Sequence, residues 1–438
     1  MNMQEPSVKD DDAVDAALLA RRQRLLGASY RLFYQRPFHP VRGEGVWLFD
    51  RHGTAHLDAY NNVACVGHCH PKVVEAIANQ AATLNTHTRY LHETILDCAE
   101  RLIDSLPAPL AQLVFTCSGS EANDLALRMA RAFTGGEGLI VTELAYHGVT
   151  QAIAEASPSL GSKVKLGTSV RTVPAPVDRG DGAAAMGARF AAGVQAAIDD
   201  LAAHGIRPAA LLLDSVFSSD GIVTDPVGFL APAVETIRRA GGLYIADEVQ
   251  AGLGRTGVLW GFPRHGVRAD LVTLGKPLGN GHPVAGVAGR RDVMDHFGET
   301  ARYFNTFGGN PVACAAALAV QRVMAEEDLV AQAATVGADL HAGLGQIAAT
   351  TDRLGAVRGA GLLAGVEVLD AQGAPDAALA QALVDGLRER QVLISATGPQ
   401  ANVLKIRPPL VFNRTHVERL CEVLEAALVD VLETWRDR

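Results

Sequence analysis

Apolar residues along the chain follow two alternating spacings, and the alternation predicts an α/β protein. Short apolar runs bounded by turn residues predict buried strands, whereas apolar residues three and four positions apart predict helices with one buried face. Helical spacing covers residues 124–133 and 229–242. The predicted strands are residues 113–116, 138–143, 210–215, 243–246 and 271–274. Strands that alternate with helices predict a mostly parallel sheet flanked by helices on both faces.

The two ends of the chain have a different pattern. Residues 43–62 predict two short strands around a turn at 50–53, and the last third predicts strands within 357–369 and 403–412. Residues 1–12 are polar and acidic, and we expect them to be disordered. Helical spacing predicts a short helix from Asp15, a long helical stretch over 311–345, and a final helix over 415–435.

This change of pattern predicts two domains. The large one, residues 76–325, contains the sheet. The smaller α+β domain is formed by the C-terminal residues 326–438, and the N-terminal segment 1–75 joins it.

Composition and charge narrow the classes of function. The chain has 438 residues, of which 48% are hydrophobic and 20% charged, as in ordinary soluble globular proteins. A net charge of −9 argues against nucleic acid as a partner. No apolar stretch reaches the roughly 20 residues of a membrane helix, and the polar N-terminus lacks a signal-peptide core. Six cysteines without a CxxC pair predict no disulfide framework. We therefore expect a cytoplasmic protein that binds neither membrane nor nucleic acid.

His68, Cys69 and His70 raise the question of a metal site. Zinc ligands usually come as spaced pairs held on a turn or a helix face. Here Pro71 follows directly and begins a predicted helix, a position that suits proline. We therefore interpret the histidines as side chains that pack the turn, and we expect no metal.

The stretch from Leu243 to Pro283 has the most distinctive chemistry. One predicted strand ends on Asp247, and a second, about thirty residues later, ends just before Lys276. Open α/β sheets bind their ligands at the carboxyl ends of the strands. The lysine is therefore either a salt-bridge partner or a covalent catalyst.

A nicotinamide site is one alternative, because Gly252, Gly254 and Gly257 spell G-x-G-x-x-G after a strand. That motif requires the glycines to open a helix whose N-terminus holds the pyrophosphate. Here Pro263 and Gly266 interrupt any such helix. The glycines therefore predict a loop.

Pyridoxal phosphate is the alternative that the residues favour. This cofactor needs a lysine, a carboxylate for its ring nitrogen, a phosphate site and a flat or apolar surface for its ring. Lys276 and Asp247 supply the first two. The segment 118–120, at a predicted helix start, offers backbone N–H groups and hydroxyls for the phosphate. Tyr146 and His147, after a strand, offer an aromatic face.

Five segments closely resemble the class III aminotransferases, which are pyridoxal phosphate enzymes of fold type I. These segments are SGSEAND, YHG, ADEVQAGLGRTG, TLGKPLGNGHP and FNTFGGNP, and the resemblance runs from about Arg42 to the C-terminus. It implies the fold type I architecture, a large domain with a mostly parallel sheet plus a smaller α+β domain. It also implies a homodimer with active sites shared between the subunits.

The resemblance further implies a role for each matching residue. Lys276 is the Schiff-base lysine, and Asp247 is the partner of the pyridinium nitrogen. The remaining cofactor contacts are Gln250 near the phenolic oxygen, Val249 on one ring face, Tyr146 or His147 on the other, and Gly119, Ser120 and, from the second subunit, Thr306 at the phosphate.

Several positions depart from the usual transaminase pattern. Lys405 stands where typical members have the arginine that grips the substrate carboxylate, and Arg407 lies two residues later, on the same face of a strand. A lysine is a point charge rather than a fork. Val149 replaces a further arginine of the ornithine-type members.

These departures resemble one branch of the family, the phosphoethanolamine and phosphohydroxylysine phospho-lyases, once described as alanine–glyoxylate aminotransferase-like proteins. YNNVACVGHCHP, LNTHTRYLHE and GNGHPVA carry this resemblance. It makes Arg89, Lys405 and Arg407 candidates for a substrate phosphate, with Asn61 or Asn62 as a hydrogen-bonding partner. An interface salt bridge is an equal interpretation of Arg89.

Two reactions are therefore expected from one site. Transfer of the amino group of a small primary amine to a 2-oxo acid is favoured, because it is the majority chemistry of the family. The alternative is elimination of phosphate from O-phosphoethanolamine or a similar phospho-amine, giving an aldehyde, ammonia and phosphate. In both, Lys276 is the general base that moves the α-proton, and a partly desolvated, electropositive pocket is expected to lower its pKa.

Overall fold

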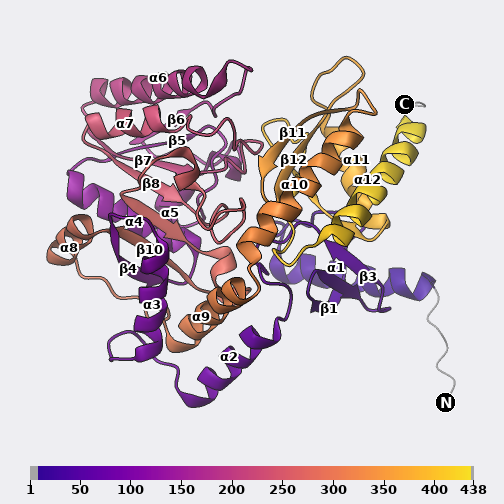
Figure 1. Cartoon of the computed structure of the whole chain (residues 1–438), viewed down its shortest axis with the longest axis horizontal. Coiled ribbons are helices and arrows are strands. Elements are labelled where there is room, and N and C mark those ends of the chain that lie inside the picture. The colour runs from indigo at the N-terminus through magenta and orange to yellow at the C-terminus, as the bar shows by residue number, and fades with distance from the viewer. Residues whose placement is uncertain (1–7, 436–438) are drawn as a thin grey trace.

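The computed structural model describes residues 8–435, and its large seven-stranded sheet lies on the left of the view in Figure 1. The strand order is β4-β10-β9-β8-β7-β5-β6. β10 is antiparallel to both neighbours, and the pairs from β9 to β6 are parallel. The strands are β4 (Leu110–Thr116), β5 (Gly138–Thr142), β6 (Val170–Val173), β7 (Pro208–Asp214), β8 (Leu243–Asp247), β9 (Leu271–Leu274) and β10 (Ala285–Arg290).

Side chains alternate between the two faces of this sheet, so that each face has its own core. In β8, Leu243 and Ile245 pack in the cluster that contains helix α4, while Tyr244 and Ala246 pack in the larger cluster on the other face. Because Asp247 continues the series of Leu243 and Ile245, it points toward α4. The helices packed on or near the sheet are α3 (Glu93–Ser105), α4 (Gly119–Thr134), α5 (Gln151–Ala154), α6 (Gly182–Ala203), α7 (Ala231–Arg239) and α8 (Arg291–Thr300).

Two four-stranded sheets are formed by the ends of the chain. In the first, β1 (Pro40–Glu44), β2 (Trp47–Asp50) and β3 (Ala55–Asp58) are extended by the parallel strand β13 (Val392–Leu393). The second has the order β11-β12-β15-β14, formed by β11 (Leu354–Ala360), β12 (Leu363–Val368), β15 (Val403–Ile406) and β14 (Ser395–Thr397). The pairing of β3 with β13 places the N-terminal segment beside the C-terminal third.

The remaining helices surround these sheets, and Figure 1 places α10, α11 and α12 beside β11 and β12 on the right of the view. α10 packs on β11 and α12, and α2 and α3 both pack on α9. These helices are α1 (Val8–Leu26), α2 (Pro71–Thr83), α9 (Pro311–Glu326), α10 (Leu329–Ala348), α11 (Ala377–Glu389) and α12 (Arg414–Trp435).

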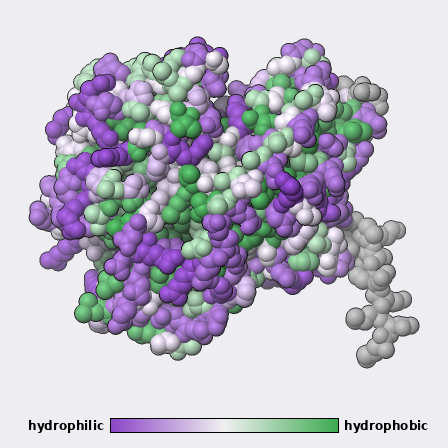
Figure 2. Space-filling model, viewed as in Figure 1, coloured by the Kyte–Doolittle hydropathy of each residue, from purple (hydrophilic) through white to green (hydrophobic). Residues whose placement is uncertain are grey.

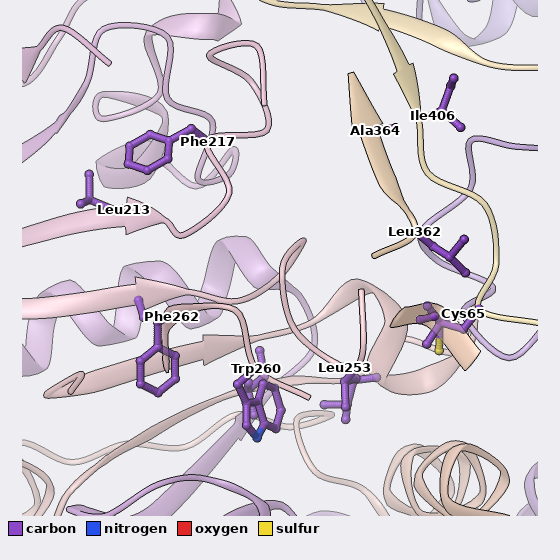
Figure 3. Packing of buried hydrophobic residues seen from close by; sticks show 14 of the residues in the cluster. Cys65, Leu213, Phe217, Leu253, Trp260, Phe262, Leu362, Ala364 and Ile406 are labelled. Carbon is purple, nitrogen blue, oxygen red and sulfur yellow. The ribbon is translucent and has the colours of Figure 1, made fainter. Parts of the chain in front are cut away.

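One buried cluster continues from the large sheet to the C-terminal sheet. Figure 3 shows Leu213, Phe217 and Phe262 among the strands of the large sheet, and Ala364 and Ile406 on the C-terminal strands. Leu362, Cys65 and Leu253 also belong to this cluster and lie below Ala364 and Ile406 in Figure 3. This shared core holds the C-terminal sheet against the large sheet.

The α/β architecture and each strand predicted in the large sheet are confirmed. Two predictions about helices are wrong. The stretch predicted as one helix over 311–345 is two helices, because Asp328 adopts a left-handed backbone with φ of 48°, which an α-helix cannot contain. The N-terminal helix begins at Val8 rather than Asp15, since an established helix gains one backbone hydrogen bond for each added residue.

The prediction of disorder over 1–12 is therefore wrong for residues 8–12, and residues 1–7 lie outside the described part of the chain. The domain boundaries at residues 75 and 325 stay a prediction. The face of the molecule in Figure 2 mixes hydrophilic and hydrophobic residues. Within residues 8–435, no helix combines the length and apolarity needed to span a bilayer.

Candidate active site

A cavity lies at the carboxyl ends of β7 and β8, where α4 begins. The residues that line it come from five separate segments of the chain, and eight of the fourteen predicted site residues are among them. Parallel strands in register deliver side chains to the same edge, and Asp214, Asp247 and Thr273 are neighbours across β7, β8 and β9. The lining residues are Gly119, Ser120, Asn123, Tyr146, His147, Gly148, Asp214, Asp247, Val249, Gln250 and Lys276.

Asp247 is a buried carboxylate with three donors around it. Its Oδ2 accepts from the Asn123 amide at 2.9 Å and lies 2.7 Å from His147 Nδ1, and its Oδ1 accepts from the Val249 N–H at 3.0 Å. Burial raises the pKa of Asp247, but the His147 contact and the nearby Lys276 charge outweigh it and hold the pKa below its ordinary value. Asp247 therefore stays ionised in a site that water hardly reaches.

The geometry separates the two aromatic candidates for the ring face. His147 is buried and turned to Asp247. Tyr146 is 37% exposed, and its ring centroid is 5.9 Å from Lys276 Nζ. Tyr146 is thus placed to cover a planar ligand above Lys276, and His147 to orient the carboxylate.

Lys276 begins a 3₁₀ turn, Lys276–Gly279, directly after β9. Its φ is +35°, a backbone conformation that a non-glycine residue adopts at a cost of about 1–3 kcal/mol and that is enriched at functional sites. Burial lowers the pKa of Lys276, and the charge of Arg407 lowers it further. A lowered pKa agrees with the role of general base that is expected of Lys276, because more of its amine is neutral near neutral pH.

The start of α4 provides an anion site. Ser118 caps the helix by accepting from the Glu121 N–H, which leaves the N–H groups of Gly119 and Ser120 facing the cavity without an acceptor among the described residues. A Cβ at Gly119 would lie 3.0 Å from Val249 Cγ2, and a Cβ at Gly148 would lie 2.4 Å from Ser120 Oγ. The close packing of this anion site therefore favours glycine at both positions.

A second group of polar side chains lies beside the cavity, behind Gln250. Arg407 Nη1 donates to Gln250 Oε1, and Lys405 Nζ donates to the Ser218 carbonyl at 3.0 Å. Lys405 is 7% exposed and Arg407 6% exposed. Burial lowers the pKa of Lys405 well below its usual range, and the charges of Arg407 and Lys276 lower it further. These three cations are therefore close enough to repel one another.

Four predicted site residues lie elsewhere in the chain. Arg89 is exposed, and its guanidinium stacks 3.8 Å from the centre of the Phe304 ring. Thr306 is also exposed and does not line the cavity. Asn61 accepts from the Val63 N–H and so stabilises its own turn. Within one chain, none of these three reaches the cofactor residues.

Asn62 is held by the protein itself. Its Oδ1 accepts from Arg255 Nε and Nη2 at 3.0 and 2.7 Å, and its amide donates to the Gln250 carbonyl at 3.3 Å. Arg255 also donates to the carbonyls of Leu362 and Pro408. The predicted contact of Asn62 with a substrate phosphate stays a prediction, because one hydrogen of the Asn62 amide has no acceptor among the described residues.

The other two early hypotheses concern the glycine pattern and the histidines. Residues 249–256 form turns rather than a helix, so the prediction of a loop is confirmed. His68 Nε2 lies 2.7 Å from Asp58, and His70 lies 3.3 Å from Glu327. Each histidine thus has a carboxylate partner, and residues 8–435 contain no group of three or more metal-ligating side chains.

Comparison with known proteins identifies the family of this site. Residues 33–428 match the family model described as aminotransferase class III. The chain belongs to the class III aminotransferase family. Enzymes of this family use pyridoxal phosphate, so the predicted cofactor is confirmed.

Individual class III relatives include both expected activities. The chain is 39% identical to a Drosophila melanogaster protein named alanine–glyoxylate aminotransferase 2-like, over 94% of this chain and 87% of that protein. It is 37% identical to ethanolamine-phosphate phospho-lyase homolog 1 of Caenorhabditis elegans, over 94% and 93%. A solved phospholyase from Arthrobacter in complex with phosphoethanolamine has 44% identity and a TM-score of 0.91, over 94% and 99%.

The residues present fit the class III cofactor. The buried, ionised Asp247 suits a protonated ring nitrogen, the free N–H groups of Gly119 and Ser120 suit a phosphate, and Lys276 suits the cofactor aldehyde. Gln250 donates one of its two amide hydrogens to Ser218, so one remains for a ring oxygen.

The sequence analysis did not single out Asn123, Asp214, Gly148, Ser218 or Arg255. Asn123 and Gly148 lie inside motifs that carried the family resemblance, and Asp214 ends a predicted strand just as Asp247 does. The strand-end rule applied to every strand would therefore have found Asp214. Arg255 also lies inside one of these motifs, ADEVQAGLGRTG, whereas Ser218 gave no comparable indication, because its partner Gln250 is 32 residues away.

Proposed function

We propose that this enzyme is a pyridoxal phosphate-dependent phospho-lyase that eliminates phosphate from O-phosphoethanolamine or a similar small phospho-amine. With one molecule of water consumed to hydrolyse the carbon–nitrogen bond, the products would be an aldehyde, ammonia and inorganic phosphate. Transamination, which the sequence favoured, becomes the second candidate.

The observation that supports this order is that Lys405 and Arg407 form no direct ion pair, and that Asp214, whose charge raises the pKa of both, acts from beyond ion-pair distance. Neither residue, nor Lys276, forms an ion pair within 4.0 Å with an acidic side chain of residues 8–435. Buried cations without an anion are unfavourable, so such a pair is normally completed by one. The cofactor phosphate has its own site at α4, which leaves the second anion to the substrate. A phosphate ester carries up to two negative charges and suits two cations better than a single carboxylate does.

The chain's own groups can carry out the elimination in a defined sequence. Lys405 and Arg407 hold the phosphate end of the substrate, which orients its amine toward Lys276. When bound, the cofactor withdraws electrons from the carbon that bears the amine. Lys276 Nζ, with its lowered pKa, accepts the proton from that carbon. The two cations stabilise the negative charge that develops on the phosphate oxygen as the carbon–oxygen bond breaks.

Transamination requires the same cofactor contacts and the same proton transfer by Lys276. It is supported by the family match and by the name of the Drosophila relative. It would need a carboxylate to occupy the place of the phosphate when the 2-oxo acid binds.

The deciding experiment gives the purified holoenzyme O-phosphoethanolamine and measures inorganic phosphate and aldehyde. We expect stoichiometric release of both without any 2-oxo acid. A matched reaction contains an amine donor and pyruvate, and alanine is measured. Rapid alanine formation with no phosphate released from phosphoethanolamine would reject the lyase in favour of the transaminase.

We also propose that the enzyme is a homodimer. Thr306 and Arg89 lie beside strongly exposed apolar side chains, with Leu91 98% and Phe307 69% exposed. Such side chains are normally covered by a partner. Light scattering after size-exclusion chromatography tests this, and a mass near that of one 46.1 kDa chain would reject it.

A further inference from the structure

The turn that follows β7 contains a buried serine that contacts both sides of the site. Ser218 is fully buried, and the residue before it, Phe217, has a left-handed backbone with φ of 48°. The turn is closed by hydrogen bonds from the N–H groups of Ile222 and Val223. The Ser218 N–H also donates to Asp214 Oδ2 at 3.0 Å, so the position of Ser218 is fixed by the backbone of its own loop together with the Asp214 carboxylate.

A chain of hydrogen bonds runs from Asp214 through the Ser218 hydroxyl and the Gln250 amide to Arg407. Ser218 Oγ is 2.5 Å from Asp214 Oδ2, and an ionised carboxylate can only accept, so the hydroxyl donates. The hydroxyl must then accept from Gln250 Nε2. This fixes the orientation of the Gln250 amide, whose Oε1 accepts from Arg407 Nη1. Arg407 is thereby held through two hydrogen bonds to Ser218.

The carbonyl of the same residue positions the second cation. Ser218 O accepts from Lys405 Nζ at 3.0 Å and from Thr397 Oγ1 at 3.0 Å. For Lys405 this is the single hydrogen bond to a described residue, and an ammonium group has three donors. Arg407 Nε donates to the Tyr60 carbonyl, and Arg407 Nη1 donates one of its hydrogens to Gln250 Oε1. Both cations therefore retain donors for an anion.

We propose that Ser218 is a specificity-determining positioning residue, which sets the separation and orientation of Lys405 and Arg407 so that together they bind the phosphate of the substrate. This inference rests on the proposed function, since it names the residue that forms its anion site. The hydroxyl does not touch the substrate and acts through Gln250 and Arg407. Its loss should therefore weaken recognition of the anion while leaving the amine end of the site intact.

The test measures binding to the holoenzyme by calorimetry with two probes. 2-Aminoethylphosphonate keeps the amine and the dianion but has no carbon–oxygen bond to break, and propylamine keeps the amine alone. In Ser218→Ala, Gln250 Nε2 loses its hydroxyl acceptor, and Asp214 loses the hydroxyl donor but keeps the backbone N–H donor of position 218. We expect the Kd of the phosphonate to rise about tenfold or more, because a charge-assisted contact is misplaced. The Kd of propylamine should change less than about twofold.

Two further variants separate positioning from general damage. Ser219→Ala removes a neighbouring hydroxyl of the same turn, for which the described residues offer no hydrogen-bond partner, and should leave both affinities unchanged. Ser218→Thr retains a hydroxyl and should bind the phosphonate more tightly than Ser218→Ala does. If Ser218→Ala is unstable in a thermal melt, the test uses Ser218→Thr instead. The ratio of its Kd values for the phosphonate and for propylamine is then compared with that ratio in the unmodified enzyme.

Each outcome bears on the inference. An unchanged phosphonate affinity in Ser218→Ala would overturn it, and so would an equal loss of affinity for both probes, which would indicate a structural role. Selective loss for the phosphonate supports it. Because binding requires no bond cleavage, selective loss in an enzyme that releases no phosphate would reject the proposed reaction while the anion site stands.

Discussion

The side of the cavity around Asp247 and the side around Lys405 and Arg407 differ in how their charges are compensated. Asp247 has three hydrogen-bond donors and a neighbouring cation. Lys405 and Arg407 are held by carbonyl and amide oxygens and have no carboxylate within ion-pair distance among the described residues. The charge of the first side has direct partners without a substrate, whereas the cations of the second side have only more distant carboxylates such as Asp214.

The two sides also differ in how the chain forms them. The cofactor side uses the ends of adjacent parallel strands and the start of α4, all within the large sheet. The proposed substrate side combines β15, the loop after β7 and the N-terminal segment. Arg255 ties the N-terminal segment to Leu362 and Pro408, which flank the C-terminal strands β12 and β15. Substitutions on the cofactor side should therefore abolish chemistry, whereas those on the substrate side should change affinity or stability.

The largest effect is expected for Lys276→Ala. Loss of the general base should lower kcat by about 10³-fold or more, near the upper range for acid–base catalysis. The absorbance of the lysine-bound cofactor should also disappear, while the protein stays folded. The matched control is Lys163→Ala, at an exposed position away from the cavity. Normal turnover by Lys276→Ala would contradict the assignment.

A large change in stability is expected for Arg255→Met. The substitution leaves Asn62 Oδ1 and the carbonyls of Leu362 and Pro408 buried without their donor, which should lower the free energy of unfolding by about 2–4 kcal/mol. Burial already lowers the pKa of Arg255 to about 9, but these acceptors keep the charge in place. Chemical denaturation measures the change, with exposed Arg414→Met as the control. An unaltered denaturation midpoint would show that the hydrogen bonds donated by Arg255 do not stabilise the fold.

A moderate effect confined to the substrate is expected for Arg407→Gln. The KM for a phospho-amine should rise about 10- to 100-fold, since one of two cations facing the anion is lost. The spectrum of the bound cofactor should stay close to normal. Arg189→Gln, at an exposed ion pair, is the control. If Arg407→Gln lost cofactor as strongly as it lost substrate affinity, Arg407 would not act on the substrate alone, which would contradict the distinction between the two sides of the cavity.

The smallest effect is a shift in pH dependence. Burial and the charge of Arg407 lower the pKa of Lys276 below the ordinary 10.5, so its neutral amine is present at lower pH than in a free lysine. The rate at which cofactor-free protein takes up pyridoxal phosphate should rise with pH and level off below 10.5. Arg407→Gln removes one cause, so the midpoint should move upward by about one pH unit or less. A downward shift would contradict this coupling.

Much of the fold could be predicted because its causes are local. Short apolar runs gave the strands of the large sheet, and Pro71 correctly marked the start of α2. The break at Asp328 was missed, because helical spacing continues on both sides and only the packing of α9 and α10 requires a turn there. The antiparallel β10 also has no local cause, since strand direction depends on the path of the chain.

The sequence by itself determined the cofactor, because Asp247 and Lys276 each end a strand and the physics of parallel strands brings such ends to one edge. It could not choose between Tyr146 and His147, which adjoin in sequence and separate only when His147 turns to Asp247. It did not predict that Arg255, 193 residues away, donates to the amide oxygen of Asn62. Only the tertiary structure brings together the residues of the proposed anion site, because Ser218, Gln250, Lys405 and Arg407 meet through contacts between distant segments, and no local pattern records such contacts.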